Sequence, residues 1–525
     1  MKYLCLFIAT LIVLPASAEQ PRVLIIGDSI SLGYTPDVKK LLGDSVTVVH
    51  NKGNAQHTST GVKKIDSWLG DKQWDVIHFN WGLWDLCYRH PDSKVQGRRD
   101  KLRGTLTTSL PDYERNLELL VARLKHTRAK LIWANTTVVP EGEAGRKLDD
   151  DLRYNEVAAR VMHKHGIRTN DLNRLSRSFD REIFVRPGDV HYTATGYQKL
   201  ATQVAAAIRD ELSRSDRPIS RILFGSCIKQ QNPVPIFDTI MDSKPDLFVF
   251  TGDNIYGDTT DMAVLQQEYD ALQKAGLTKL QQSCEVIATW DDHDYGVNDG
   301  GASYPMRDQS RDVFLKFWRN GNQPPHAGVY DSHFYGPADR RVQVILLDTR
   351  YFRSDLKKGE KRVGGSWVPD DDRSKTMLGA EQWGWLEDQL KQPAQFRIIV
   401  SSIQFIAEDA GQEAWANLPH ERQRMIDLLK QTKANDVVFI SGDRHWSELS
   451  VLPKTLDYPL FDLTCSSLNQ VHTRGTPTRN RHRFLPQTFH KPNFGIISLD
   501  WSSPQPSVTM QIRDSEGNVQ IEHRL

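Results

Sequence analysis

The chain has 525 residues, of which 39% are hydrophobic and 25% are charged, and its formal net charge is +1. This length is enough for two or three domains. A nearly neutral charge argues against nucleic acid as the main partner, because binding to a phosphate backbone needs a basic surplus.

The first residues have the features of a secretory signal peptide. Lys2 supplies a positive charge, residues 3–14 are mostly apolar, and Ala16-Ser17-Ala18 is a small-residue cleavage site. The apolar stretch is too short to favour a membrane span. We therefore predict a signal peptide at 1–18, no transmembrane segment after its removal, and a secreted or periplasmic mature protein. The four remaining cysteines form no dense disulfide framework.

Short apolar runs alternate with helical patterns over the first 200 residues. This alternation predicts a parallel sheet that is covered by helices on both faces. The expected strands are 23–26, 46–50, 76–80 and 130–135, and the clearest helices are 113–125 and 195–212. The polar, proline-containing stretch 213–218 is the predicted linker, so we expect domains at 19–212 and 219–525.

The first expected strand is followed directly by Gly27-Asp28-Ser29. A serine at a strand-to-helix turn is well placed to act as a nucleophile. Late in the same domain, His191 is a candidate general base and Asp189 its orienting partner. Gly53 is a candidate backbone donor to an oxyanion.

These residues resemble the SGNH (GDSL-type) hydrolase family over 22–212. The resemblance implies a flavodoxin-like three-layer fold and esterase or acetylhydrolase activity, with Ser29, Asp189 and His191 as the catalytic triad and Gly53 at the oxyanion.

The sequence departs from the SGNH pattern at two places. The family's Gly-x-Asn-Asp block reads Gly82-Leu83-Trp84-Asp85, so Trp84 stands where the family has an oxyanion-binding asparagine. Asn80 is the candidate replacement donor. The usual Asp-x-x-His spacing is also one residue shorter here, between Asp189 and His191.

A second α/β series begins at residue 221. The expected strands are 221–224, 247–250, 342–348, 397–402, 437–441 and 495–499, and the expected helices lie around 262–275, 310–319, 380–391 and 420–432. Several of these strands end in turns that are rich in carboxylate, imidazole, thiolate or phenol groups. Ligand groups collect at strand ends in such sheets.

The polar turns carry the side chains expected at a two-metal hydrolase. Asp253 could bridge two cations, the phenolate of Tyr256 suits a ferric ion, and Cys227 could add a thiolate. His293 is the candidate donor of a proton to the leaving oxygen. The remaining candidate ligands are Asp292, Asp443 and His445.

This half resembles the alkaline phosphatase D family of metallophosphoesterases over residues 219–525. The matching stretches are 225–227, 251–256, 289–293, 347–350, 378–383, 418–422 and 441–445. The resemblance implies a four-layer α/β sandwich that hydrolyses phosphomonoesters or phosphodiesters at an Fe³⁺ and Ca²⁺ centre, with other divalent metals as alternatives. Arg350 is either a phosphate contact or half of a structural ion pair. The sequence leaves open whether Asp291 or Asp292 is the ligand.

The combined prediction is an exported hydrolase of two α/β domains. The second domain cleaves phosphate esters, and the first is an acyl or acetyl esterase acting on acylated glycans or lipids. The alternative is that the first domain is a non-catalytic, glycan-binding module in which Trp81 and Trp84 stack on sugars. Sulfate esters are a further alternative substrate of the metal site.

Overall fold

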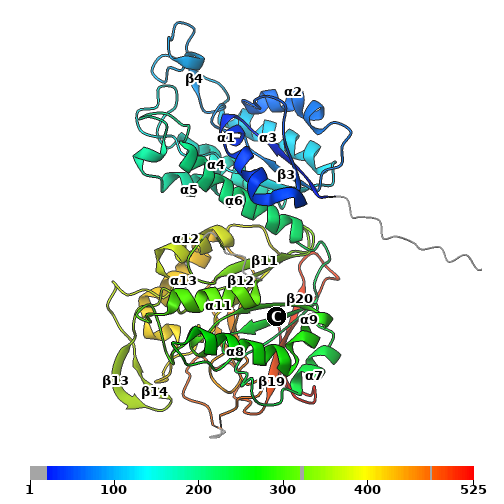
Figure 1. Ribbon diagram of the computed structural model, residues 1–525, viewed down its shortest axis with the longest axis vertical. Helices are drawn as coiled ribbons and strands as arrows, with labels where there is room; N and C mark the ends of the chain where they lie inside the picture. The colour runs from blue at the N-terminus through cyan, green and yellow to red at the C-terminus, as the bar shows by residue number, and fades with distance from the viewer. Residues whose placement is uncertain (1–19, 320–323, 325, 473–475) are drawn as a thin grey trace, which may run out of the picture. The chain divides into compact units, whose positions relative to one another are not determined.

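The computed structural model (Figure 1) describes residues 20–319, 324, 326–472 and 476–525. The predicted signal peptide lies outside these residues. No helix within the described ranges is both long and apolar enough to cross a membrane. The chain divides into two compact units, one comprising residues up to Ala158 together with Asn170–Leu212, and the other Ala159–Thr169 together with Ser213–Leu525.

The first unit is built on a five-stranded sheet in the order β2-β1-β3-β6-β7. The pairs β1–β2, β1–β3 and β3–β6 are parallel. This is the flavodoxin-like strand order. The strands are β1 (Arg22–Ile26), β2 (Thr47–His50), β3 (Val76–Phe79), β6 (Lys130–Ala134) and β7 (Arg168–Asn170).

Helices cover both faces of this sheet. From β1 the chain adds β2 on one side of the strand and then β3, β6 and β7 in turn on the other side. Because both kinds of crossover are right-handed, the helices that connect these strands lie on opposite faces of the sheet. Gly33 of α1 packs directly on Tyr197 of α6, and Asn116 of α3 donates to the hydroxyl of Thr58 in α2. The three-layer prediction is therefore confirmed. The helices are α1 (Ser29–Leu42), α2 (Thr58–Leu69), α3 (Leu110–Lys125), α4 (Asp150–Lys164), α5 (Leu172–Arg177) and α6 (Ala194–Ser213).

The second unit contains two six-stranded sheets. The first has the order β10-β9-β8-β19-β20-β21 and the second β11-β12-β15-β16-β18-β17. The strands of the first are β8 (Arg221–Gly225), β9 (Leu247–Thr251), β10 (Glu285–Thr289), β19 (Asn493–Asp500), β20 (Ser507–Asp514) and β21 (Val519–Arg524). Those of the second are β11 (Asp331–Tyr335), β12 (Val342–Leu346), β15 (Phe396–Val400), β16 (Val437–Ser441), β17 (Glu448–Leu452) and β18 (Leu460–Thr464).

The two sheets pack face to face, and helices cover their outer faces. Phe224 of β8 and Val438 of β16 lie in one core between the sheets, whereas Leu223 packs among the helices. Strands buried on both faces in this way read as continuous apolar runs. The predicted four-layer sandwich is therefore confirmed. The covering helices are α7 (Ile236–Asp242), α8 (Met262–Leu272), α9 (Thr278–Ser283) and α11 (Arg307–Trp318) on one side, and α12 (Gly379–Leu390) and α13 (Pro419–Thr432) on the other.

Candidate active sites

Ser29 lies at the first residue of α1, directly after the turn that ends β1. The carboxylate of Asp28 caps the helix by accepting from the Ile30 N–H at 2.9 Å. The Gly27 N–H donates to the side chain of Asn51 at 2.9 Å, which ties this turn to the end of β2. The turn thus holds Ser29 half-buried at the carboxyl edge of the sheet.

Ser29, His191 and Asp189 form a continuous hydrogen-bonded chain. The Ser29 hydroxyl is 2.8 Å from His191 Nε2, and His191 Nδ1 is 2.7 Å from the Asp189 carboxylate. Burial opposes ionisation of Asp189, but the hydrogen bonds from His191 and the charge of Arg186 together lower its pKa. The Asp-x-His spacing therefore still lets the carboxylate orient the imidazole.

The oxyanion candidates differ in how they are held. Gly53 has a left-handed φ of 76°, and no described residue accepts a hydrogen bond from its N–H. Asn80 follows β3 and donates one amide N–H to the Ala134 carbonyl at 2.7 Å. Trp84 is half-buried under the guanidinium of Arg89, 4.7 Å from its ring centre. Gly53 and Asn80 therefore remain the donor candidates.

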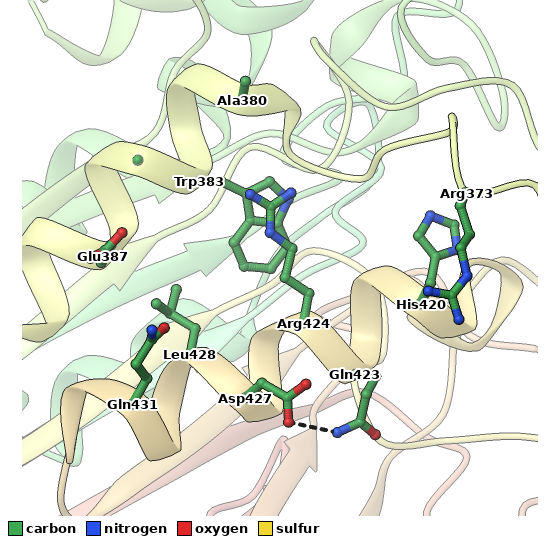
Figure 2. A pocket seen from close by; sticks show the side chains of 11 residues that line it. Arg373, Ala380, Trp383, Glu387, His420, Gln423, Arg424, Asp427, Leu428 and Gln431 are labelled. Carbon is green, nitrogen blue, oxygen red and sulfur yellow. Dashed lines mark hydrogen bonds between the residues drawn. The ribbon is translucent and has the colours of Figure 1, made fainter.

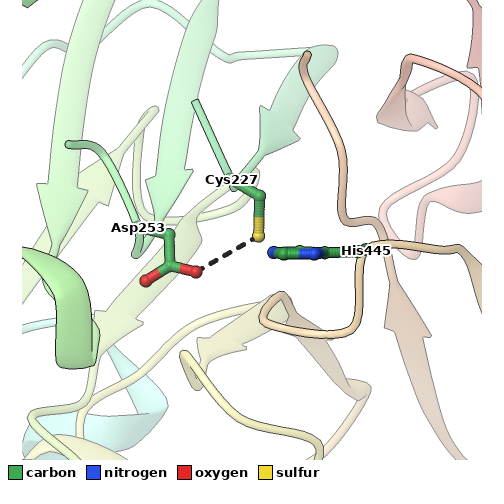
Figure 3. Close-up of side chains that lie close together, drawn as sticks. All are labelled: Cys227, Asp253 and His445. Atoms are coloured by element: carbon green, nitrogen blue, oxygen red, sulfur yellow. Dashed lines mark hydrogen bonds between the residues drawn. The ribbon is translucent and has the colours of Figure 1, made fainter. Parts of the chain in front are cut away.

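The candidate metal ligands converge from the ends of several strands of the second unit. Cys227 follows β8, Asp253 and Tyr256 follow β9, and Asp292 begins the short helix α10 (Asp292–Tyr295) after β10. Asp443 and His445 follow β16 of the other sheet. Figure 3 shows Cys227, Asp253 and His445 pointing toward one another.

Asp253 is the residue around which the others gather. Its carboxylate lies 3.3 Å from the Cys227 sulfur and 3.5 Å from the Tyr256 hydroxyl. The Tyr256 hydroxyl is also 2.9 Å from His445 Nε2. Ligand atoms within 4.8 Å of one another make up three groups that share Asp253, namely Cys227–Asp253–His445, Asp253–Asp292–His293 and Asp253–Asp291–Asp443.

Four of the candidate ligands have a left-handed backbone. The φ angles of Cys227, Asp253, Asp443 and His445 are 60°, 50°, 66° and 59°. Non-glycine residues seldom adopt this conformation, and it clusters at functional sites where the surrounding structure enforces it. Backbone strain thus falls on four of the residues that the sequence marks as ligands.

The chemistry of this cluster fits bound cations. Among the described residues, the buried atoms Asp253 Oδ1 and Asp291 Oδ2 have no hydrogen-bond partner. Burial and the neighbouring Cys227 raise the pKa of Asp253 well above its ordinary value, and burial also raises the pKa of Asp443. Buried, crowded acceptors of this kind are stabilised in their charged form by a cation.

His293 is held beside this cluster by Asp258. Its Nδ1 atom is 2.8 Å from each oxygen of the Asp258 carboxylate, and its ring packs 4.2 Å from that of Tyr256. Burial opposes protonation of His293, but Asp258 and the carboxylates of Asp253 and Asp292 outweigh it and raise its pKa to about 11. Asp258 received no role from the sequence, although it stands two residues after Tyr256.

Arg350 is fully buried in an ion-pair network and does not open onto the cluster surface. Its Nε atom donates to Asp291 at 2.6 Å, and its guanidinium pairs with Glu413 at 2.6 Å. Glu413 also pairs with Arg353 at 2.7 Å. The structure therefore shows the ion pairs of the structural alternative, and the phosphate-contact role stays a prediction. Glu413 was missed because it lies in an irregular loop without a sequence pattern.

The two adjacent aspartates both face the cluster. Ser402 and Arg350 bind one oxygen of Asp291, each at 2.6 Å. Asp292 accepts from the Asp299 N–H at 2.7 Å. Each of the two therefore belongs to a possible ligand group that contains Asp253.

A hollow of about 470 Å³ lies away from these residues, between α12 and α13 (Figure 2). The Arg424 guanidinium lies over the Trp383 ring there, 4.5 Å from its centre. None of the candidate site residues lines it. We therefore assign the chemistry to the strand ends and not to this hollow.

Comparison with known proteins gives matches for the chain. A model of the PhoD-like phosphatase family matches residues 222–485. Alkaline phosphatase D of Bacillus subtilis is 27% identical over 193 residues, an alignment that covers 32% of this chain and 32% of that protein. The chain thus spans about a third of this curated relative.

Solved structures resemble the chain at low identity. The structure of PhoD has a TM-score of 0.43 and 18% identity and covers 59% of this chain and 72% of its own. The acetyl xylan esterase AlAXEase has a TM-score of 0.30 and 17% identity, and the match covers 36% of this chain and 99% of that protein. The lipase/acylhydrolase from Enterococcus faecalis has a TM-score of 0.30 and 18% identity and covers 36% and 95%.

Proposed function

The chain belongs to the PhoD-like phosphatase family, and on that basis we propose that its second unit hydrolyses phosphate monoesters or diesters with bound metal ions. The observation that carries this proposal is the convergence of Cys227, Asp443, His445 and the adjacent aspartates Asp291 and Asp292 on Asp253. Cys227, Asp253, Tyr256 and His445 would hold a ferric ion, and Asp253, Asp443 and one of the two adjacent aspartates a calcium ion. Such ions polarise a phosphoryl group and activate a water molecule.

The protein's own groups do the remaining work. His293, whose Nδ1 atom lies 2.8 Å from the Asp258 carboxylate, donates a proton to the leaving oxygen of the ester. Arg350 fixes Asp291 and therefore acts through the carboxylate that it positions. The burial of Asp253 holds its carboxylate in place, where it would bind the metal ions.

Metal analysis of the purified protein tests this proposal, alongside turnover of phosphomonoester, phosphodiester and sulfate ester substrates. We expect iron and calcium in the parent protein and preference for phosphate esters. Asp253→Ala should lose both metal and phosphatase activity, whereas Asp238→Ala, which removes an exposed carboxylate of α7, should keep both. Full metal content together with full activity in Asp253→Ala would show that the assigned centre is wrong.

For the first unit we propose acyl or acetyl ester hydrolysis. The geometry that supports it is the chain from Ser29 through His191 to Asp189. Ser29 attacks the ester carbonyl while His191 takes the serine proton and Gly53 donates its N–H to the developing oxyanion. His191 then gives the proton to the departing alcohol, and a water molecule that it activates releases the acyl group from Ser29. Acylated glycans or lipids are the proposed substrates.

The glycan-binding alternative is weaker in one respect. Trp81 is 1% exposed and packs on Trp68 and Phe79, so it belongs to the core and cannot stack on a sugar. Labelling with an organophosphate and turnover of acetyl esters separate the two readings. Labelling that is lost in Ser29→Ala supports the esterase, and an inert Ser29 with no turnover supports the binding module.

We also propose that the protein is exported. The composition of residues 1–18 supports this, with a charged start, an apolar stretch and small residues before the cleavage site. Sequencing the mature N-terminus tests it, and cleavage after Ala18 is the expected result.

A further inference from the structure

A strongly basic segment of the first unit takes no part in either proposed reaction. It runs from β4 (Tyr88–Arg89) to β5 (Thr105–Leu106), and we call residues 88–106 the basic excursion. It carries six lysine and arginine side chains against two aspartates, a net charge of +4 where the whole chain carries +1. Figure 1 shows β4 and its loop extending away from the helices and sheet of their unit.

Among the large hydrophobic residues that the structure describes, the most exposed one lies in this excursion. Leu102 is 90% exposed and stands between Lys101 and Arg103. The turn that carries it is fixed by Asp100, whose side chain accepts from the N–H groups of Leu102 and Arg103 at 3.1 and 3.0 Å. A Cβ on Gly104 would lie 2.2 Å from the Asp100 carbonyl oxygen, so this tight turn needs glycine. Leu102 is therefore held outward by a built turn.

A second turn of the excursion presents similar chemistry. Val95 is 40% exposed, and Lys94 and Arg98 beside it are exposed. The Arg98 N–H donates to the Val95 carbonyl at 2.8 Å, and the side chain of Arg89 binds the Gly97 carbonyl. This turn, too, holds an apolar side chain outward between cations.

We propose that the basic excursion binds an anionic lipid surface, with Leu102 and Val95 entering the headgroup region and the surrounding cations facing lipid phosphates. A single exposed leucine is ordinary on a protein surface. Here two apolar side chains stand in fixed turns among cations, which is the combination that binds an anionic membrane interface. A soluble polyanion would engage the cations but gain nothing from Leu102.

The excursion is tied to the rim of the Ser29 site. Arg99 pairs with the buried Glu143 at 2.7 Å, and Glu143 pairs with Arg146 at 3.0 Å. Asp28 is the neighbour of Ser29. Burial raises the pKa of Asp28, and the positive charge of Arg146 partly offsets this by lowering it. Binding at a lipid surface would therefore bring the serine site close to esters carried by that surface. The binding itself does not depend on either proposed activity.

Co-sedimentation of the full mature chain with lipid vesicles tests the proposal. One vesicle type contains equal parts of phosphatidylcholine and phosphatidylglycerol, and the other contains phosphatidylcholine alone. The test variants are Leu102→Ser and the double variant Lys94→Glu/Arg98→Glu. The matched controls are Leu119→Ser, which removes an exposed leucine of α3, and Lys63→Glu/Lys64→Glu on α2.

We expect the parent protein to sediment with the anionic vesicles, less so at high salt, and to stay in the supernatant when the vesicles are neutral. Each cation at such a surface contributes roughly a fivefold gain in affinity. The double reversal should therefore weaken binding by well over tenfold, and Leu102→Ser by several fold, with unchanged melting temperatures. Both control variants should bind like the parent. Asp253→Ala should also bind like the parent, because the phosphate-ester centre lies in the other unit.

Three outcomes would overturn the proposal. One is no binding of the parent to anionic vesicles at low salt. Another is full binding by Leu102→Ser when the charge reversal abolishes it, together with competition by soluble polyphosphate, which would identify a soluble polyanion as the partner. The third is loss of binding in Asp253→Ala, which would place the lipid contact at the metal centre.

Discussion

Both carboxylate oxygens of Asp258 lie 2.8 Å from Nδ1 of His293, beside the carboxylates that gather around Asp253. The charge of Asp258 therefore affects how readily the His293 imidazole is protonated. The negative charge of Asp258 favours the protonated imidazole, so His293 is available as a proton donor until the pH rises through its pKa.

Asp258→Asn should therefore move the alkaline limb of kcat to lower pH. An imidazolium that loses a neighbouring negative charge releases its proton more readily, by roughly one to three pH units for a contact this close. The effect should be larger for alkyl phosphates than for p-nitrophenyl phosphate, because only the poor leaving group needs the proton. The pH profiles of the two substrates measure it.

The matched control is Asp261→Asn, which changes a nearby exposed carboxylate that caps α8 and keeps the cap. Its pH profile should equal that of the parent. An unchanged alkaline limb in Asp258→Asn with both substrates would remove His293 from the proton-donor role.

Tyr256 gives a spectroscopic prediction. If Cys227, Asp253, Tyr256 and His445 hold a ferric ion, the phenolate should produce a visible charge-transfer band. Tyr256→Phe should lose this band while the melting temperature stays within a few degrees of the parent. Absorption spectra together with iron analysis measure this, and a colourless, fully active parent without iron would contradict it.

The buried network around Arg350 predicts a stability effect. Arg350→Met leaves Asp291 and Glu413 without one partner inside the protein. Removing one member of a buried ion pair typically destabilises a protein by about 3–5 kcal/mol. We expect a clearly lower denaturant midpoint, whereas Arg373→Met, at an exposed arginine, should leave the midpoint unchanged. A normal midpoint with a raised KM for phosphate esters would instead return Arg350 to the phosphate-contact reading.

The parts of the fold that could be predicted are those with a strong local pattern. Strands β9 and β16 are fully buried, and β8 is buried apart from Arg221 at its start. All three are mostly apolar runs that end in polar turns, so both the strands and the positions of Cys227 and Asp253 follow from the sequence. Strands β20 and β21 were missed because polar and apolar residues mix in them, and β21 lies at the edge of its sheet.

The parts of the site that could not be predicted depend on tertiary contacts. Glu413 reaches Arg350 from a distant loop, and no spacing in the sequence joins the two. The spacing between Asp189 and His191 is one residue shorter than in the SGNH pattern, yet the Asp189 carboxylate still lies 2.7 Å from His191 Nδ1. Both contacts depend on the direction of the side chains, which a sequence pattern does not contain.

The last prediction concerns the oxyanion donor of the first unit. Asn80 donates one N–H to Ala134, which fixes the plane of its amide and leaves its second N–H for a substrate oxygen. Losing one oxyanion donor lowers kcat by roughly 10²–10³-fold. We therefore expect Asn80→Ala to reduce acetyl esterase kcat by about that factor.

Asn80→Asp is the matched variant, because it keeps the shape of the side chain and replaces the donor by an acceptor. It should lose at least as much kcat as Asn80→Ala, with organophosphate labelling of Ser29 also slowed. If Asn80 only anchors the end of β6, both variants should lower the melting temperature and leave kcat near that of the parent. In that case we expect Trp84→Asn, which restores the oxyanion asparagine of the SGNH pattern, to raise esterase turnover.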